Sequence, residues 1–250
     1  MDIIADRLRG LAGGRVLDLA TGSGAFAARL AAGLASYDAI CAVDSSPRAL
    51  QAARANLAGL RAARVEEADA AALPYPDASF DTVAVANSLH HFADPRAVLA
   101  EAARVLAPGG RLLVLEMHRE AADAPAESHV LLHHWWAAVD SAGGTFHAET
   151  LDRAAIRALM VGSCLSAESW DEVPGDEDDP LDPGLLAEIE GAVTAYRGKI
   201  AALREGAALP EGALAALEAR GGELLARVRR VGFRSAPSLF FVGRKTEGTA

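Results

Sequence analysis

Two acidic residues, Asp18 and Asp44, each lie at the end of a short apolar run, and a glycine-rich turn follows the first run. Gly22 and Gly24 permit a tight turn and allow the bare backbone to approach a ligand closely. A carboxylate beside such a turn would repel a pyrophosphate, whereas it would attract a cation or an amino group. These residues therefore predict a binding site for a small molecule that carries positive charge.

The same turn also satisfies a fingerprint for dinucleotides, Gly22-x-Gly24-x-x-Ala27, with Asp44 twenty residues after Gly24. A nicotinamide (NAD)-dependent oxidoreductase is therefore one alternative. S-adenosylmethionine (SAM) suits the acids better, because it has no phosphate, carries an ammonium and a sulfonium, and offers ribose hydroxyls to a carboxylate. We expect Asp18 to contact the amino end of SAM, directly or through water, and Asp44 to bind the ribose hydroxyls.

Six features in register over residues 15–117 resemble the motifs of the class I SAM-dependent methyltransferase family. Ala20 stands where the commonest form of the first motif has a glycine, a variant also seen in the quinone-methyltransferase branch. The resemblance covers about the first half of the chain and implies SAM as the cofactor. The six segments are Val16–Gly24, Ala42–Ser46, Glu67–Tyr75, Phe80–Val83, Asn87–Phe92 and Val105–Leu112.

The resemblance also assigns positions around the cofactor. It implies that Asp44 binds both ribose hydroxyls and that Asp69 reaches the adenine amino group. Asn87 follows the fourth expected strand and should line the pocket beside the methyl group. The complete set of expected cofactor-binding residues is Asp18, Ala20, Gly22, Gly24, Asp44, Ser45, Asp69, Ala70 and Asn87.

Histidines are concentrated between residues 118 and 147, in the segment that usually forms the acceptor pocket of such enzymes. In a helix expected over 127–140, His129 and His133 share one face at i, i+4. Three interpretations stay open: a metal site, a metal-free acid/base and aromatic pocket, or packing of an amphipathic helix. The metal site is the least favoured of the three, since this histidine-rich segment has no cysteine and no His-Glu-x-x-His motif. The metal candidates would be His129, His133, His134 and His147, and the candidate catalytic bases are His91, His133 and His147.

The elements that must position these residues alternate between strand and helix. The pattern predicts an α/β fold with a doubly wound, seven-stranded, mostly parallel sheet and an antiparallel last strand. Residues 1–117 would form a Rossmann-like SAM-binding core, and 118–250 an acceptor-pocket region with a helical insertion at about 182–231. The strands are expected near 15–19, 39–43, 63–68, 80–86, 111–117, 165–173 and 237–244.

Composition and charge exclude some classes of partner and location. A formal net charge of −10 argues against nucleic-acid binding, which needs many cations to neutralise phosphates. The sequence has no apolar window long enough for a membrane span, no secretory signal and only two cysteines, so we expect a cytoplasmic protein. The leading hypothesis is a methyltransferase acting on the N, O, S or C atom of a small molecule. The alternatives are the oxidoreductase and a non-catalytic SAM-binding or assembly subunit. The helical insertion could pack as part of the core, act as a lid or form a homodimer surface.

Overall fold

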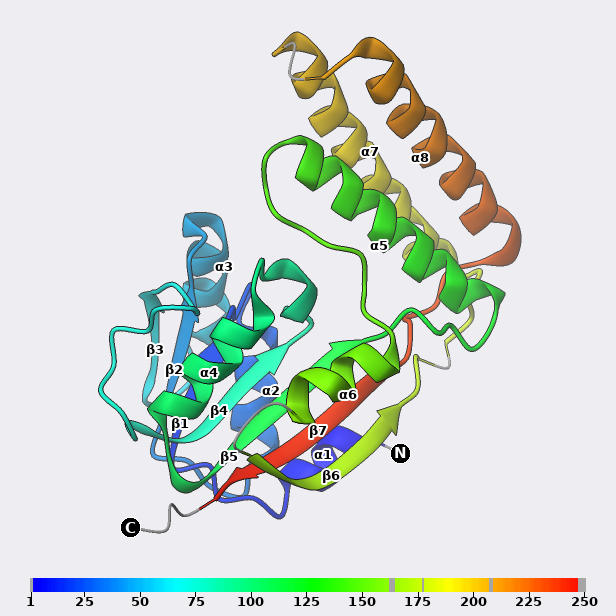
Figure 1. Cartoon of the computed structure of the whole chain (residues 1–250). Helices are drawn as coiled ribbons and strands as arrows, with labels where there is room; N and C mark the ends of the chain where they lie inside the picture. Colours follow the sequence, from blue (N-terminus) through cyan, green and yellow to red (C-terminus); the bar gives the residue numbers. More distant parts are fainter. Residues whose placement is uncertain (1, 162–164, 177, 207–208, 247–250) are drawn as a thin grey trace.

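A seven-stranded sheet with the order β3-β2-β1-β4-β5-β7-β6 lies at the centre of the computed structural model (Figure 1). Neighbouring strands are parallel except that β7 runs antiparallel to both β5 and β6. The fold class predicted from the sequence is confirmed. The structure describes residues 2–161, 165–176, 178–206 and 209–246. The strands are β1 (Arg15–Leu19), β2 (Ala39–Asp44), β3 (Ala63–Glu67), β4 (Phe80–Ala86), β5 (Leu106–Met117), β6 (Leu165–Val173) and β7 (Ser238–Lys245).

Strand β5 begins earlier than the sequence predicts. Leu106 already pairs with Phe80 of β4, and the register then shifts before the regular ladder starts. The Pro108-Gly109-Gly110 segment was expected to precede the strand, yet it lies within β5. A Cβ at Gly110 would come within 2.8 Å of the Asp81 carbonyl oxygen, so a glycine permits the close approach of the two strands there.

Helices cover both faces of the sheet and bury it. Helices α1, α2 and α3 pack their apolar sides on one face, and α4 and α6 cover the other face (Figure 1). Such two-sided cover explains why the central strands read as continuous apolar runs. The bounds are α1 (Ile3–Leu8), α2 (Ala25–Gly33), α3 (Pro47–Leu57), α4 (Pro95–Val105) and α6 (Arg153–Val161), with a short 3₁₀ helix η1 (Leu89–His91) after β4.

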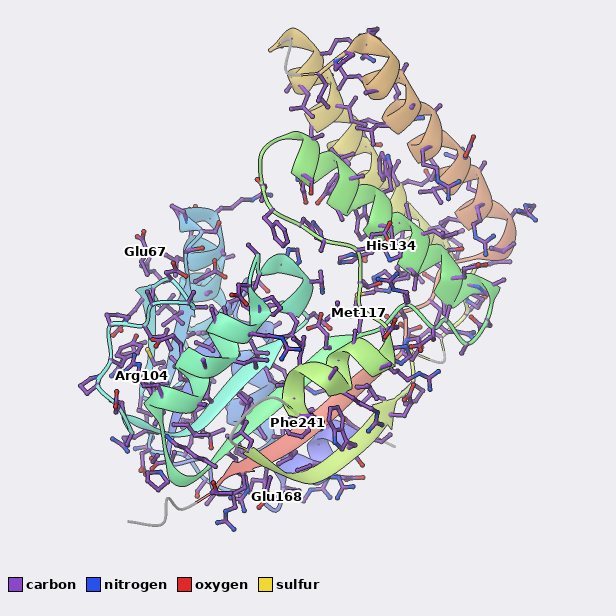
Figure 2. The ribbon with its side chains drawn as sticks, viewed as in Figure 1. Glu67, Arg104, Met117, His134, Glu168 and Phe241 are labelled. Atoms are coloured by element: carbon purple, nitrogen blue, oxygen red, sulfur yellow. The ribbon has the colours of Figure 1, made fainter. Side chains whose placement is uncertain are left out.

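Three long helices form a lobe beyond the carboxyl ends of the strands: α5 (Ala124–Ala142), α7 (Pro183–Glu205) and α8 (Glu211–Val231) (Figure 1). The insertion predicted at about 182–231 supplies α7 and α8, and their apolar residues pack against each other and against α5. Trp135 of α5 is buried in this core, and its indole N–H donates to the Leu217 carbonyl at 2.8 Å. A small apolar cluster of Met117 (labelled in Figure 2), Val130 and Ala236 connects the lobe to the sheet.

The packing of α8 against Trp135 leads to a stability prediction. A Cβ at Gly221 would lie only 2.9 Å from Cε2 of the Trp135 ring, so Gly221→Ala should destabilise the protein by about 1–3 kcal/mol through overpacking. Gly198 of α7 is the matched control, because a Cβ there meets no heavy atom within 4 Å. Gly198→Ala should stabilise by about 0.5–1 kcal/mol, since alanine favours a helix. Urea unfolding measures the change in the free energy of unfolding for each variant. A change of the same sign in both variants would contradict this account.

Among the described residues, no helix combines the length and the apolar character that crossing a membrane requires. The two longest helices carry several ion pairs, such as Arg204 with Glu211 and Arg229 with Glu190. Of the two cysteines, Cys41 is buried in β2, and Cys164 lies outside the described residues.

Candidate functional site

The glycine turn after β1 is held against the end of β2 by one carboxylate. Asp44 accepts hydrogen bonds from the Gly22 N–H at 2.9 Å and from the Ser46 N–H at 2.8 Å, one on each oxygen. Gly22 and Gly24 have φ values of +56° and +82°, and Ala20 is left-handed as well at +49°. Glycine is required at position 24 for a second reason, because a Cβ there would come within 2.9 Å of Leu57. The bare turn and Asp44 therefore form one unit.

Two adjoining cavities of about 690 and 430 Å³ open over this unit, at the carboxyl ends of β1, β2 and β4. This edge is where open α/β sheets bind their ligands, beside the point at which strand order reverses. Every residue predicted to bind the cofactor lines one or both cavities except Asp18 and Gly24. The larger cavity contains Ala20, Gly22, Asp44, Ser45 and Asn87, and the smaller contains Ala20, Asp44, Ser45, Asp69 and Ala70.

Asp18 lies beneath the turn and not on the cavity wall. It is 1% exposed, and the Thr21 hydroxyl donates to its Oδ2 at 2.5 Å, while Oδ1 has no hydrogen-bond partner among the described residues. Burial raises the pKa of Asp18 to about 7, against the lowering effect of the Thr21 hydrogen bond. Since Thr21 itself lines the larger cavity, Asp18 is one hydrogen bond removed from the site.

The buried carboxyl of Asp18 should make stability depend on pH. Its folded-state pKa is about 7, whereas a carboxyl in the unfolded chain titrates near about 4. Between these values the folded state holds a proton that the unfolded state releases, so the free energy of unfolding falls as pH rises through this window. We expect Asp18→Asn to lose less stability than the wild type between pH 5 and pH 8 in urea unfolding. The same pH dependence in both proteins would contradict the prediction.

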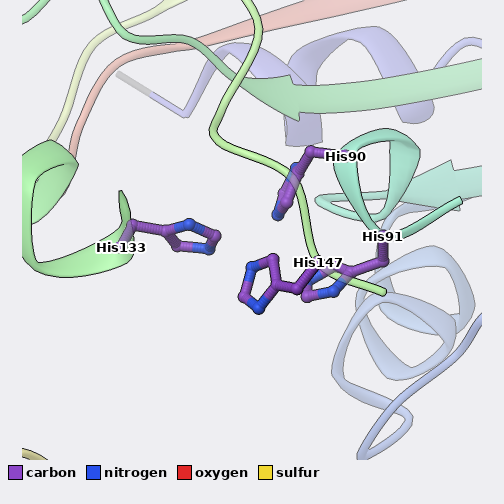
Figure 3. A group of neighbouring side chains, drawn as sticks. All are labelled: His90, His91, His133 and His147. Atoms are coloured by element: carbon purple, nitrogen blue, oxygen red, sulfur yellow. The ribbon is translucent and has the colours of Figure 1, made fainter. Parts of the chain in front are cut away.

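Four histidines from three segments converge next to the cofactor cavities (Figure 3). Each offers a ring nitrogen, and these four nitrogens all lie within 4.8 Å of one another. His91 lines both cavities and is exposed, whereas His90 and His147 are buried. The group, here called the histidine cluster, consists of His90 and His91 on η1, His133 on α5 and His147 in the α5–α6 loop.

A carboxylate holds each of the two buried rings. The Nδ1 of His90 lies 2.5 Å from Oε1 of Glu116, whose side chain is fully buried. Because the other oxygen of Glu116 accepts the backbone N–H groups of Ser88 and Leu89, the carboxylate is the acceptor and His90 the donor. The Nδ1 of His147 lies 3.0 Å from Asp140 in the same manner. Both rings therefore present Nε2 to the cluster.

The electrostatics of the cluster favour neutral rings. Burial, followed by the charges of His90 and His147, lowers the pKa of His133 to about 2. Burial raises the pKa of Asp140, but hydrogen bonds from His147, Lys199 and Tyr196 outweigh this effect and lower it to about 2. Burial likewise lowers the pKa of His91 to about 3, so the rings of His91 and His133 are uncharged near neutral pH.

Two of the four predicted metal candidates lie apart from this cluster. His129 shares a helix face with His133, but its Nδ1 accepts from the Ala236 N–H at 2.9 Å and its ring packs on Phe233. His134 (labelled in Figure 2) bonds Thr150 through Nε2 at 2.8 Å. Helical spacing alone predicts that His129 lies near His133, but contacts with Ala236 and Thr150 hold His129 and His134 outside the cluster. Of the four candidates, the structure therefore brings only His133 and His147 together in the cluster.

Sequence reasoning missed Glu116 and the inclusion of His90. Glu116 had the same signal as Asp18 and Asp44, an acid near the end of an apolar strand, but it was read as part of the strand. Phe146 was also missed: it lines both cavities and is 51% exposed, and nothing in its sequence context marks it. These residues extend the site from the cofactor turn to the α5–α6 loop.

Comparisons with known proteins agree with this geometry. Residues 17–114 match the family model described as a methyltransferase domain. A demethylmenaquinone methyltransferase of Thermus thermophilus is 48% identical over 104 residues, which are 41% of this chain and 46% of that protein. The 27-O-demethylrifamycin SV methyltransferase of Amycolatopsis mediterranei is 45% identical over 118 residues, 44% of this chain and 42% of that protein. These matches span less than half the length of each curated relative.

Several solved structures have a similar fold over nearly the whole length of this chain. A SAM-dependent methyltransferase of Methanosarcina mazei has a TM-score of 0.59 at 15% identity and covers 99% of both chains. The [4+2]-cyclase SpnF has a TM-score of 0.59 at 19% identity, covering 99% of this chain and 80% of that one. At these identities the solved structures show a shared fold.

Proposed function

We propose that this protein transfers a methyl group from SAM to a small-molecule acceptor, because residues 17–114 match the family model described as a methyltransferase domain. The observation that carries the proposal is the cleft over the glycine turn, in which Asp44 and the Gly22 backbone face a cavity large enough for a nucleoside. The name of the Thermus relative suggests a quinone-type acceptor, which is the first class to test.

The residues present fit SAM. Asp44 would accept both ribose hydroxyls, and Asp69 with Ala70 would border the adenine in the smaller cavity. Asn87 would lie toward the methyl group, and the Thr21 hydroxyl oxygen, whose hydrogen is donated to Asp18, would accept from the amino end. Among the described residues, no arginine or lysine lines the smaller cavity, whereas Arg29 lines the larger one. When bound, SAM supplies an electrophilic methyl group on a sulfonium.

The histidine cluster is our candidate for the acceptor side. An oxygen or carbon acceptor must lose a proton, and a neutral imidazole can accept it. We propose His91 as the base because it lines the cleft, and burial, which lowers its pKa to about 3, makes it a weak one. His133 and His147 contact its ring and would hold or polarise the acceptor. A nitrogen or thiolate acceptor would need only orientation and exclusion of water, to which Phe146 at the rim would contribute.

Calorimetric titration of the purified chain with SAM and, separately, with NAD tests the cofactor. We expect micromolar binding of SAM and no binding of NAD. A panel of hydroxylated quinones with methyl-labelled SAM then tests transfer. NAD binding without SAM binding would establish the oxidoreductase instead. SAM binding with no transfer to any acceptor would favour the non-catalytic subunit.

Three expectations from the sequence remain proposals. We propose a cytoplasmic location, a functional boundary at residue 117, and pairing of two copies through α7 and α8. Light scattering of the full chain tests the pairing directly.

A further inference from the structure

We propose that the histidine cluster binds a divalent first-row transition-metal cation of the Zn²⁺ class. Imidazole nitrogen is a preferred donor for zinc, copper, iron and nickel, and three or four such donors make a complete or nearly complete ligand set. The sequence alone ranks this interpretation below a metal-free pocket and below helix packing, because the histidine-rich segment has no cysteine and no His-Glu-x-x-His motif. The ligands would be His90, His91, His133 and His147.

The first support is a set of buried nitrogens without partners. Nε2 of His90, Nε2 of His147 and Nδ1 of His133 are each buried, and none has a hydrogen-bond partner among the described residues. Buried polar atoms in proteins nearly always have a hydrogen-bond partner, so three buried ring nitrogens without one in the same place need an explanation. A cation among these rings would satisfy the atoms together, whereas a single proton would satisfy only one or two.

The second support is the orientation of the rings. A metal-binding histidine typically donates its other ring N–H to a carboxylate or carbonyl, which fixes the tautomer and raises the basicity of the ligating nitrogen. His90 does so to Glu116 and His147 does so to Asp140. Each carboxylate is itself fixed by further donors, Glu116 by two backbone N–H groups and Asp140 by Tyr196 and Lys199. Both lone pairs therefore face the centre of the cluster.

The third support is the balance of charge. Glu116 is fully buried, and its hydrogen-bond partners in the described structure are the backbone N–H groups of Ser88 and Leu89 and the ring of His90. An ionised carboxylate in such surroundings is costly unless a positive charge lies nearby. A dication bound to His90 would lie one imidazole away from Glu116 and would compensate that carboxylate, whereas Asp140 already pairs with Lys199 at 2.6 Å.

Little movement separates the cluster from a tetrahedral site. Zn–N bonds of about 2.0–2.1 Å place the nitrogens of a tetrahedron about 3.3 Å apart. The nitrogens of the cluster already lie within 4.8 Å of one another, so rotations of the rings would close the gap. His91 is the exposed member and faces the cleft, and it is therefore the ligand that an acceptor atom would replace. A bound cation would then act on the acceptor in place of a histidine base.

The test uses the full chain without an affinity tag, stripped of metal with a chelator and dialysed. Calorimetry with Zn²⁺ should give one equivalent bound with micromolar affinity or tighter, and Co²⁺ should give the visible absorption of a tetrahedral nitrogen site. No SAM is added, so the outcome is independent of the proposed methyl transfer. Absence of stoichiometric binding of both ions would overturn the proposal.

Variants test the ligand set. His133→Ala and the exposed His91→Ala should each weaken Zn²⁺ binding, the first by at least about 100-fold. His134→Ala is the matched control, because it neighbours His133 on α5 but bonds Thr150 outside the cluster. Its affinity should equal that of the wild type. Equal affinity in His133→Ala and His134→Ala would overturn the assignment.

Glu116→Gln tests the orientation of His90 without removing a ligand. The amide oxygen can still accept the backbone N–H groups, but its NH₂ would donate to Nδ1 of His90. The ring proton would then move to Nε2 and block the lone pair. We expect about 10–100-fold weaker Zn²⁺ binding in a protein that still folds, as circular dichroism would verify. Unchanged affinity in the folded variant would contradict this orientation.

Discussion

Asp44→Asn should weaken SAM binding by at least about 100-fold, because a hydrogen bond to a charged group contributes about 1.5–3 kcal/mol and the ribose offers two hydroxyls. The substitution also removes one of the two acceptor oxygens that hold the Gly22 and Ser46 N–H groups. The turn and the ribose contact would therefore be lost together. Calorimetric titration with SAM measures the change.

Asp38→Asn is the matched control for this experiment. Asp38 precedes β2 and is exposed, whereas Asp44 ends the same strand at the cleft. The control removes the same charge at the amino end of β2, away from the cleft, so the SAM affinity of Asp38→Asn should match that of the wild type. If both variants bind SAM equally well, Asp44 does not bind the ribose and the assignment of the cleft must change.

Glu116→Ala should lower the free energy of unfolding by about 3–5 kcal/mol, because it removes one partner from a buried charged network. The Ser88 and Leu89 N–H groups and Nδ1 of His90 would all lose their acceptor in a place that water does not reach. Urea unfolding followed by circular dichroism measures the loss.

Glu116→Gln separates the hydrogen bonds from the charge. The amide keeps an acceptor for the two backbone donors, so we expect a loss of no more than about 1–2 kcal/mol. An alanine variant as stable as the glutamine variant would show that these buried donors find other partners. The account of Glu116 as the residue that positions η1 would then be wrong.

The cofactor turn was predictable because its signals are local. Gly22 and Gly24 are needed for φ values that the chain adopts within a few residues of β1, and Asp44 ends an apolar run that reads directly as a strand. The alternation of strands and helices then requires parallel strands whose carboxyl ends meet at one edge. Residues separated in sequence but attached to those ends, such as Gly22 and Asp44, must therefore come together.

The boundaries of elements were less predictable where a tertiary contact decides them. Helix α5 was expected over 127–140, and it extends from Ala124 to Ala142 because Asp123 caps its start and the lobe buries its length. The sequence indicated that the insertion packs on itself, but not that α5 completes its core. Trp135 shows this, since its partners Leu217 and Gly221 lie far along the chain.

What the sequence by itself determined about this protein is the fold class, the glycine turn with its acids and the concentration of histidines after residue 117. Only the tertiary structure decided which histidines meet. The α5–α6 loop folds back on η1 through the Ala148 N–H, which donates to the His90 carbonyl at 2.9 Å, and this contact carries His147 to His90 and His91. Helical periodicity predicts which side chains share a face, but a loop has no such period. The membership of the cluster therefore depended on contacts between segments that no local pattern encodes.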